Sequence, residues 1–129
     1  MENSKSVAVL GGGSFGTVLA NLAASNGYNV SLWVRDSEQA LRINSEGANT
    51  TYHPELKLSK NIIASDNLKE VLNNKSIIFI ATPSIVFEQI VIRVSDYIDE
   101  KPYLVSCTKG ILDDPFRPLS EIISSKLNN

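Results

Sequence analysis

The strongest structural signal in the chain is residues 6–25, which read SVAVLGGGSFGTVLANLAAS. An apolar strand over residues 6–10 leads into a glycine-rich turn and a helix of small residues over 17–25, so a G-x-G-x-x-G pattern stands between strand and helix. In such turns Gly11 permits the tight bend, Gly13 lets a pyrophosphate approach the backbone, and Gly16 lets helix and strand pack closely. N–H groups at the helix start attract phosphates. The segment predicts dinucleotide binding; the simpler interpretation is a turn that only needs flexible glycines.

Short apolar segments recur along the rest of the chain and predict a sheet. The expected strands are residues 6–10, 29–34, 61–64, 76–81 and 103–106. The run IIFIA at residues 77–81 is apolar without alternation, which is typical of a strand buried on both faces of a parallel sheet. Helical spacing between the strands predicts repeated βαβ units, and hence an α/β fold with a doubly wound, Rossmann-type parallel sheet.

Three further helices are expected between these strands. Apolar side chains at helical spacing predict one over residues 84–97. Asp36, followed three residues later by Gln39, resembles a capping box at the start of another, and Asp66 precedes a short helical pattern over residues 68–72. Residues 47–60 show no period and exceed the usual length of such a connection, so we expect a loop that serves a ligand.

The composition limits the classes of protein to which the chain can belong. Its 129 residues are 43% hydrophobic and 20% charged, which suits one globular domain but not two. The net charge of -2 gives no overall attraction to nucleic acid or to an anionic membrane. Residues 7–24 are too polar for a signal peptide or a membrane span. Cys107 is the only cysteine and cannot form an internal disulfide, so a cytoplasmic location is expected.

Ligands of an open parallel sheet bind beyond the carboxyl ends of its strands, so the residues after each strand form the candidate site. Arg35 and Asp36 follow the second strand, where the 2′ position of the cofactor is usually recognised. Arg35 can pair with the 2′-phosphate of NADPH, whereas Asp36 can hold a ribose hydroxyl. In the alternative interpretation Asp36 only caps a helix and Arg35 is a solvated charge. We expect NADPH to be accepted.

Two more strand ends carry candidate residues. Thr82 and Pro83 follow the fourth strand and can form a wall beside the nicotinamide, although a proline there is also a common helix start. Lys109 stands in a short turn after the fifth strand and would project into the same crevice. Its ammonium can hold a substrate phosphate or polarise a carbonyl oxygen. The alternative is an ordinary surface lysine.

The remaining candidates are weaker. Phe15 can lie over the cofactor or simply pack, and Tyr52 and His53 in the 47–60 loop can border the adenine. A single histidine without further ligands predicts no metal site. Cys107, at a strand end among apolar neighbours, predicts a buried inert thiol rather than a nucleophile.

Five segments, in order and at suitable spacing, resemble the amino-terminal part of NAD(P)-dependent sn-glycerol-3-phosphate dehydrogenase. They are VAVLGGGSFGT at residues 7–17, LWVRD at 32–36, NTTYHP at 49–54, ATPS at 81–84 and LVSCTKGI at 104–111. The last segment, which holds Lys109, is the most specific, because a glycine-rich turn alone fits many dehydrogenase families.

The resemblance implies reversible hydride transfer between NADPH or NADH and dihydroxyacetone phosphate, giving sn-glycerol 3-phosphate for phospholipid synthesis. It implies that Ser14, Phe15, Arg35, Lys109 and also Tyr52 contact the cofactor. Lys109 is the expected catalytic residue and substrate contact. Together with the positions at the strand ends, the expected cofactor-binding set is Gly11, Gly13, Ser14, Phe15, Gly16, Arg35, Asp36, Tyr52, Thr82, Pro83 and Lys109.

The chain departs from the family pattern at three positions and in its length. Gly12 stands in place of alanine, Phe15 of tryptophan and His53 of leucine. In the family a helical domain follows and holds the general acid–base lysine, so we expect residues 1–129 to be a truncated nucleotide-binding domain with little activity of its own. The expected partners are the phosphorylated substrate, the helical domain and, for the full-length protein, a second copy of the chain. We expect the helical domain to dock against a surface that includes a helix over residues 119–127.

Two other functions are compatible with the same residues. One is a non-catalytic module that binds a dinucleotide as a signal or a structural ligand. The other is the nucleotide domain of a different dehydrogenase, of ketopantoate or sugar-nucleotide type, against which the turn at residues 108–110 argues.

Overall fold

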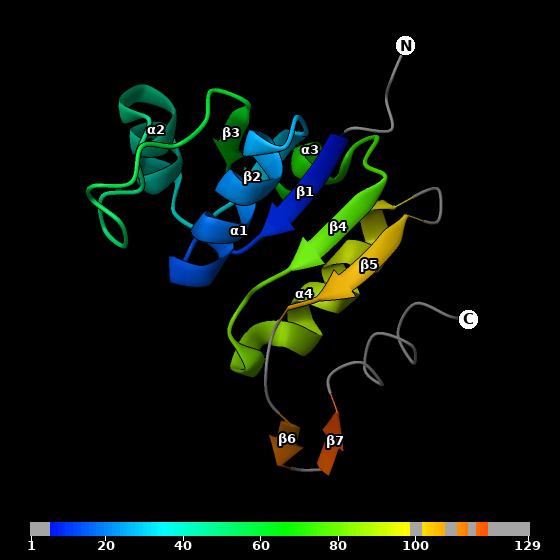
Figure 1. Cartoon of the computed structure of the whole chain (residues 1–129). Helices are drawn as coiled ribbons and strands as arrows, with labels where there is room; N and C mark the ends of the chain where they lie inside the picture. Colours follow the sequence, from blue (N-terminus) through cyan, green and yellow to red (C-terminus); the bar gives the residue numbers. More distant parts are fainter. Residues whose placement is uncertain (1–5, 99–101, 108–110, 114–115, 119–129) are drawn as a thin grey trace.

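The computed structural model describes residues 6–98, 102–107, 111–113 and 116–118. Within them, a five-stranded sheet has the order β3-β2-β1-β4-β5, and all neighbouring strands are parallel (Figure 1). The strands are β1 (Ser6–Leu10), β2 (Asn29–Trp33), β3 (Ile62–Ser65), β4 (Ile77–Ile80) and β5 (Tyr103–Ser106). This sheet confirms the predicted doubly wound α/β class.

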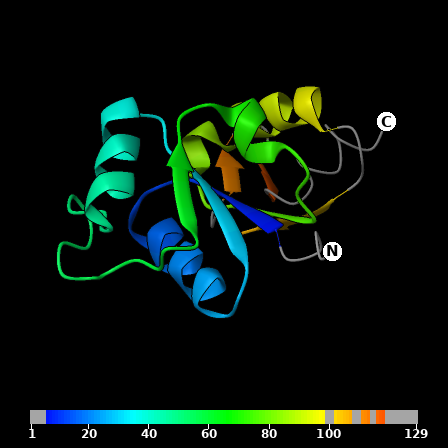
Figure 2. The same ribbon diagram turned by 90° about the horizontal axis from the view of Figure 1, so that it is seen from above.

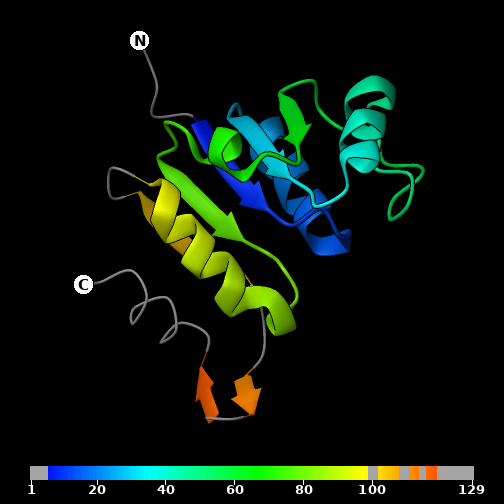
Figure 3. The same cartoon turned by 180° about the vertical axis from the view of Figure 1, so that it is seen from behind.

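Helices cover both faces of the sheet. They are α1 (Ser14–Ser25), α2 (Ser37–Glu46), α3 (Leu68–Leu72) and α4 (Ser84–Tyr97). α1 and α2 bury Ala20 and Ile43 in the core on one face, whereas α3 and α4 bury Val71 and Phe87 in the core on the other (Figure 2). Figure 3 shows α4 running along β4 and β5 on the face opposite α1.

The central strand β1 is buried on both sides because of this arrangement. Val7 and Val9 belong to the core beneath α1 and α2, and Ala8 and Leu10 belong to the core beneath α3 and α4. None of the four is more than 1% exposed. A strand covered on both faces has no solvent side that would require polar residues, which explains its unbroken apolar sequence.

Most element boundaries lie where the sequence predicts them. β1, β5, α3 and α4 match, while β2, β3 and β4 differ by single residues at their ends. α1 begins at Ser14 rather than at residue 17, because the helix starts inside the glycine-rich turn. Its first intrahelical bond runs from the N–H of Thr17 to the carbonyl oxygen of Gly13, at 3.0 Å.

The predicted capping box at α2 is wrong in one of its two parts. Asp36 is the N-cap, and its Oδ1 accepts the backbone N–H of Glu38 at 3.0 Å. Gln39 does not bond back to Asp36, because its side chain donates to the carbonyl oxygen of Gly12 instead. The residue that looked like a local cap therefore makes a long-range contact.

The start of α3 also differs from the sequence prediction. Its N-cap is Asn67, one residue after Asp66, and Asn67 Oδ1 accepts the backbone N–H of Glu70 at 3.1 Å. Asparagine and aspartate cap helices about equally well, so sequence alone does not choose between adjacent ones.

A separate pair of strands lies outside the main sheet. β6 (Ile111–Asp113) pairs antiparallel with β7 (Phe116–Pro118), as Figure 1 shows. Strands of three residues are too short to show the alternation by which strands are recognised, and the sequence analysis did not predict them. The helix expected over residues 119–127 lies outside the described residues.

Truncation of Phe87, the largest of the fully buried side chains, tests the packing of α4. We expect Phe87→Ala to lower the free energy of unfolding by about 3–5 kcal/mol, because it removes buried apolar area and leaves a cavity. Urea unfolding followed by circular dichroism measures the change. Ile85→Ala is the matched control on the same helix, since Ile85 is 86% exposed. Equal losses in the two variants would contradict the packing.

Candidate functional site

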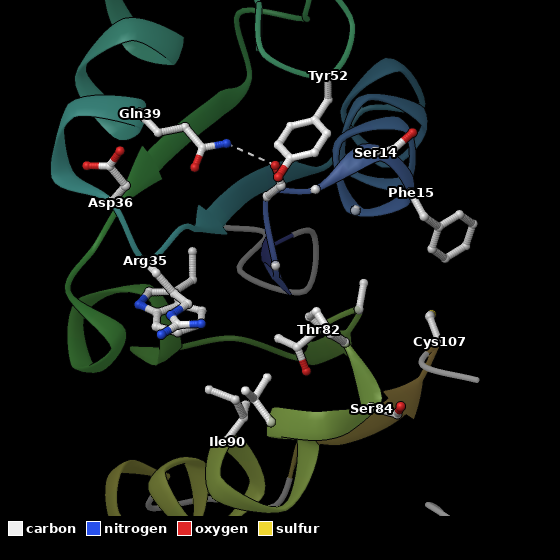
Figure 4. A pocket seen from close by; sticks show the side chains of 18 of the residues that line it. Ser14, Phe15, Arg35, Asp36, Gln39, Tyr52, Thr82, Ser84, Ile90 and Cys107 are labelled. Carbon is white, nitrogen blue, oxygen red and sulfur yellow. Dashed lines mark hydrogen bonds between the residues drawn. The ribbon is translucent and has the colours of Figure 1, made fainter. Parts of the chain in front are cut away.

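The order of the strands reverses between β1 and β4, and a cavity of about 1090 Å³ opens at their carboxyl ends. In open α/β sheets this switch point is where ligands bind. The cavity is lined by the glycine-rich turn, the end of β2, the β4–α4 connection and the first turns of α4 (Figure 4). Topology therefore brings together segments that are far apart in sequence.

The glycine-rich turn passes too close to its neighbours for side chains at three of its positions, of which Gly12 would meet the side chain of Val34 and the other two would meet backbone atoms. Gly11 has φ of 120°, and an added Cβ would lie 2.7 Å from the carbonyl oxygen of Ala81 after β4. A Cβ on Gly16 would overlap the carbonyl oxygen of Gly11. These contacts match the predicted purposes of the first and third glycines of the motif.

The start of α1 faces open space. Its N-cap is Gly13, no side chain caps it, and its first turn holds no acidic residue. A Cβ added at Gly13 would meet no atom within 4 Å. The first backbone N–H groups of a helix have no carbonyl partner within the helix, and they carry its partial positive charge. This end of α1 can therefore hold an anion such as a pyrophosphate without a basic side chain.

The carbonyl oxygen of Gly12 fixes the shape of the turn. It accepts Nδ2 of Asn49 at 2.8 Å and Nε2 of Gln39 at 3.0 Å, the latter dashed in Figure 4. Asn49 Nδ2 also donates to Thr17 Oγ1 at 2.7 Å, and Asn49 is only 1% exposed. The turn is thus attached to α2 and to the 47–60 loop before any ligand binds.

The 47–60 loop makes a second contact with the turn. Nε2 of His53 lies 3.1 Å from Ser14 Oγ and 3.0 Å from the carbonyl oxygen of Ser14. Tyr52, which is 48% exposed, lines the cavity from the same loop (Figure 4). Tyr52 agrees with the expectation that this loop serves the site. His53 does not line the cavity, and it bonds to the start of α1 rather than bordering the adenine position.

The end of β2 supplies one wall. Trp33 is 3% exposed and lines the cavity, and its Nε1–H donates to the carbonyl oxygen of Asp66 at 3.1 Å. Arg35 and Asp36 follow on the exposed rim, and both line the cavity. Figure 4 shows them on the side away from Phe15. Asp36 is thus both a helix cap and a cavity residue, two roles that the sequence analysis treated as alternatives.

The β4–α4 connection and the end of β5 form the facing wall. Thr82, Pro83 and Cys107 line the cavity, and the N–H of Cys107 donates to the carbonyl oxygen of Ile80 at 2.8 Å. Cys107 is half-buried rather than fully buried as predicted, and this burial raises the pKa of its thiol. A raised pKa lowers the thiolate fraction, which agrees with the predicted inert thiol.

All predicted cofactor-binding residues except Lys109 line this single cavity. They are Gly11, Gly13, Ser14, Phe15, Gly16, Arg35, Asp36, Tyr52, Thr82 and Pro83. Lys109 and its neighbour Thr108 lie outside the described residues. The cavity therefore brings together predicted residues from four separate parts of the chain.

Several lining residues were missed by the sequence analysis. Among them are Gln39 from α2 and Val86, Gln89, Ile90 and Arg93 from α4. Those on α4 recur three or four residues apart and so share one face of the helix. Because this helix starts at the switch point, that spacing was the signal by which they could have been found. Asn49 gave no such signal, because its partners lie 32 and 37 residues away.

The described part of the chain offers neither a metal-binding cluster nor a membrane-spanning helix. No group of three or more potential metal-ligating side chains occurs there. No helix there is both long and apolar enough to cross a membrane.

A parallel doubly wound sheet, with a glycine-rich turn and an uncapped helix start at its switch point, defines the class of Rossmann-type dinucleotide-binding domains. Sequence comparison makes the assignment specific. The family model described as NAD-dependent glycerol-3-phosphate dehydrogenase N-terminus matches residues 6–129, and the chain belongs to this family.

Individual relatives agree with the family match. Glycerol-3-phosphate dehydrogenase [NAD(P)+] of Alcanivorax borkumensis is 42% identical over 122 residues, covering 95% of this chain and 36% of the relative. The crystal structure of glycerol-3-phosphate dehydrogenase from Coxiella burnetii superposes with a TM-score of 0.91 at 31% identity, covering 99% of this chain and 39% of that one. The structure of the Saccharomyces cerevisiae enzyme superposes with a TM-score of 0.85 at 27% identity, covering 95% of this chain and 39% of that one. The chain thus spans little more than a third of the length of these relatives.

Replacing Asn49 tests the attachment of the turn. We expect Asn49→Ala to lower the free energy of unfolding by about 1–3 kcal/mol, because it removes two donors from a buried network. Thr50→Ala, at the exposed neighbouring position, is the control and is expected to be near neutral. Thermal unfolding of the two variants in parallel gives the comparison. An Asn49→Ala variant as stable as the parent chain would refute the role of this network.

The raised pKa of Cys107 leads to a prediction about reactivity. Because only the thiolate reacts, iodoacetamide should alkylate the folded chain at pH 8 more slowly than the urea-unfolded chain. The folded-state rate should keep rising with pH beyond 9.0, the ordinary pKa of the thiol. Mass spectrometry follows the reaction at this one cysteine. Equal rates in the two states at pH 8 would contradict the burial of the thiol.

Proposed function

We propose that this chain binds NADPH or NADH at the switch point, as the nucleotide-binding part of an enzyme that interconverts dihydroxyacetone phosphate and sn-glycerol 3-phosphate. The observation that carries the proposal is the uncapped, open start of α1 behind the turn at Gly11–Gly16. Relatives of the chain carry the name glycerol-3-phosphate dehydrogenase [NAD(P)+], which supports the choice of reaction.

The residues around the cavity fit such a dinucleotide from end to end. Ser14 and Phe15 start α1, where the pyrophosphate would lie against backbone N–H groups. Arg35 and Asp36 stand at the end of β2, where the adenosine ribose would lie. Tyr52, Thr82 and Pro83 complete the walls. When bound, the nicotinamide supplies or accepts the hydride of the reaction.

Lys109 is proposed as the residue that contacts both cofactor and substrate. It follows Cys107 by two positions, and Cys107 lines the cavity at the end of β5. A cation at this edge of the sheet would attract the phosphate of the substrate and stabilise negative charge on the carbonyl oxygen as it becomes an alkoxide. The proposal for Lys109 also includes its contact with the nicotinamide end of the cofactor.

The cellular setting is part of the proposal. We propose a cytoplasmic protein, supported by a single cysteine that cannot pair within the chain. We also propose that the enzyme acts at full length as a pair of identical chains, on the strength of the family resemblance. The simpler alternative for the chain is a module that binds the dinucleotide without catalysis.

Calorimetric titration of the chain with NADPH and with NADH tests the proposal. We expect saturable binding of both, and about tenfold weaker binding to Lys109→Ala, because a charge-assisted contact is lost. Lys69→Ala is the matched control, since Lys69 is an exposed lysine on α3 outside the cavity.

Each outcome has a definite meaning. Binding of neither cofactor by the folded chain would overturn the proposed function. An unchanged Kd for both cofactors in Lys109→Ala would mean that Lys109 does not contact them. The same substitution in the full-length protein separates an enzyme from a non-catalytic module. The assay is oxidation of NADPH by dihydroxyacetone phosphate. Only an enzyme oxidises NADPH in this assay, and its rate should fall in Lys109→Ala.

A further inference from the structure

A second guanidinium lines the cavity besides that of Arg35. Arg93 comes from α4, and its Cζ lies 5.6 Å from the centroid of the Trp33 ring. Ile90, three residues earlier, lies on the same helix face and also lines the cavity. Figure 4 shows Ile90 on the same side of the cavity as Arg35, away from Phe15 and Cys107. Arg93 therefore belongs to the end of the cavity formed by β2 and α4.

Trp33 holds this guanidinium on a fixed surface. The ring is almost fully buried, and its Nε1–H donates to the carbonyl oxygen of Asp66 at 3.1 Å, so its orientation is set. A guanidinium over an indole face is attracted by the ring quadrupole, while its N–H groups point outward in its own plane. Arg93 is thus held in place without using the N–H groups that bind oxyanions.

The charges around this end of the cavity favour an anion. Within residues 6–98 and 102–107, neither Arg35 nor Arg93 takes part in an ion pair. Asp36 is the one acidic residue among the described cavity residues, and its Oδ1 already accepts the N–H of Glu38. Two cations beside one carboxylate leave a net positive charge, and planar guanidiniums match the oxygens of a phosphate.

We propose that Arg93 acts together with Arg35 to bind the 2′-phosphate of the adenosine ribose, so that the chain prefers NADPH to NADH. The inference rests on the proposed function, because it assigns one end of the same dinucleotide site. A single arginine after β2 is compatible with either cofactor, since Asp36 offers a carboxylate to a ribose hydroxyl. A second guanidinium from α4 shifts the balance, because it contacts only the ligand that carries the extra phosphate.

Calorimetric titrations with NADPH and NADH on the parent chain and on Arg93→Gln test this inference. We expect Arg93→Gln to raise the Kd for NADPH about tenfold or more, because a charge-assisted contact is lost, and to leave the Kd for NADH within about twofold. Arg93→Lys keeps the charge but not the planar fork, so an intermediate loss is expected. Raising the salt concentration should weaken NADPH binding less steeply in Arg93→Gln than in the parent.

Arg42→Gln is the matched control. It removes a guanidinium from α2 outside the cavity, and we expect it to leave both Kd values unchanged. Circular dichroism establishes that each variant is folded, and Arg93→Lys takes the place of Arg93→Gln if the latter is not.

The outcomes separate this inference from the function on which it rests. A parent chain that binds neither cofactor overturns the proposed function, and the role of Arg93 with it. A parent chain that binds both cofactors, with a ratio of Kd values that Arg93→Gln does not alter, overturns only the inference. Equal losses for NADPH and NADH would likewise overturn it, because they would mean that Arg93 supports the cavity without contacting the 2′-phosphate.

Discussion

The carbonyl oxygen of Gly12 is the point at which the site is held together. It accepts Nδ2 of Asn49 and Nε2 of Gln39, so one backbone atom joins the glycine-rich turn to the 47–60 loop and to α2. A buried amide network of this kind is stable only when its donors and acceptors are paired, which restricts the turn to one conformation. That conformation leaves the start of α1 facing the cavity. Pre-organisation of this kind reduces the entropy that ligand binding would otherwise cost.

The sheet topology determines where the rest of the site lies. Because β1 and β4 are neighbours and their helices leave to opposite faces, the turn after β1 and the connection after β4 border a common cavity. The uncapped start of α1 marks one region of this cavity, and Arg35 with Trp33 marks another. A long ligand with a phosphate group in its middle fits this arrangement better than a compact one. The architecture and the family assignment thus agree on a dinucleotide.

Local patterns predicted most of the fold and of the cavity lining. Unbroken apolar runs located the strands, and the glycine-rich motif located the turn, because both depend on neighbouring residues. Contacts between distant segments were not predictable: Asn49 meets the turn 37 residues away, and Arg93 on α4 meets Trp33 on β2. Gln39 was assigned to a local cap because the capping pattern does not register a distant acceptor such as Gly12. The position of Lys109 after β5 stays a prediction.

We propose that the backbone N–H groups at the start of α1 bind the pyrophosphate of NADPH or NADH. Amide chemical shifts of the ¹⁵N-labelled chain, recorded while NADH is added, test it directly, because they report on each N–H separately. We expect saturable changes that are largest at Gly13, Ser14, Phe15 and Gly16, and small changes on the exposed side of α2. Changes confined to residues away from the cavity, with the turn amides unmoved, would contradict it.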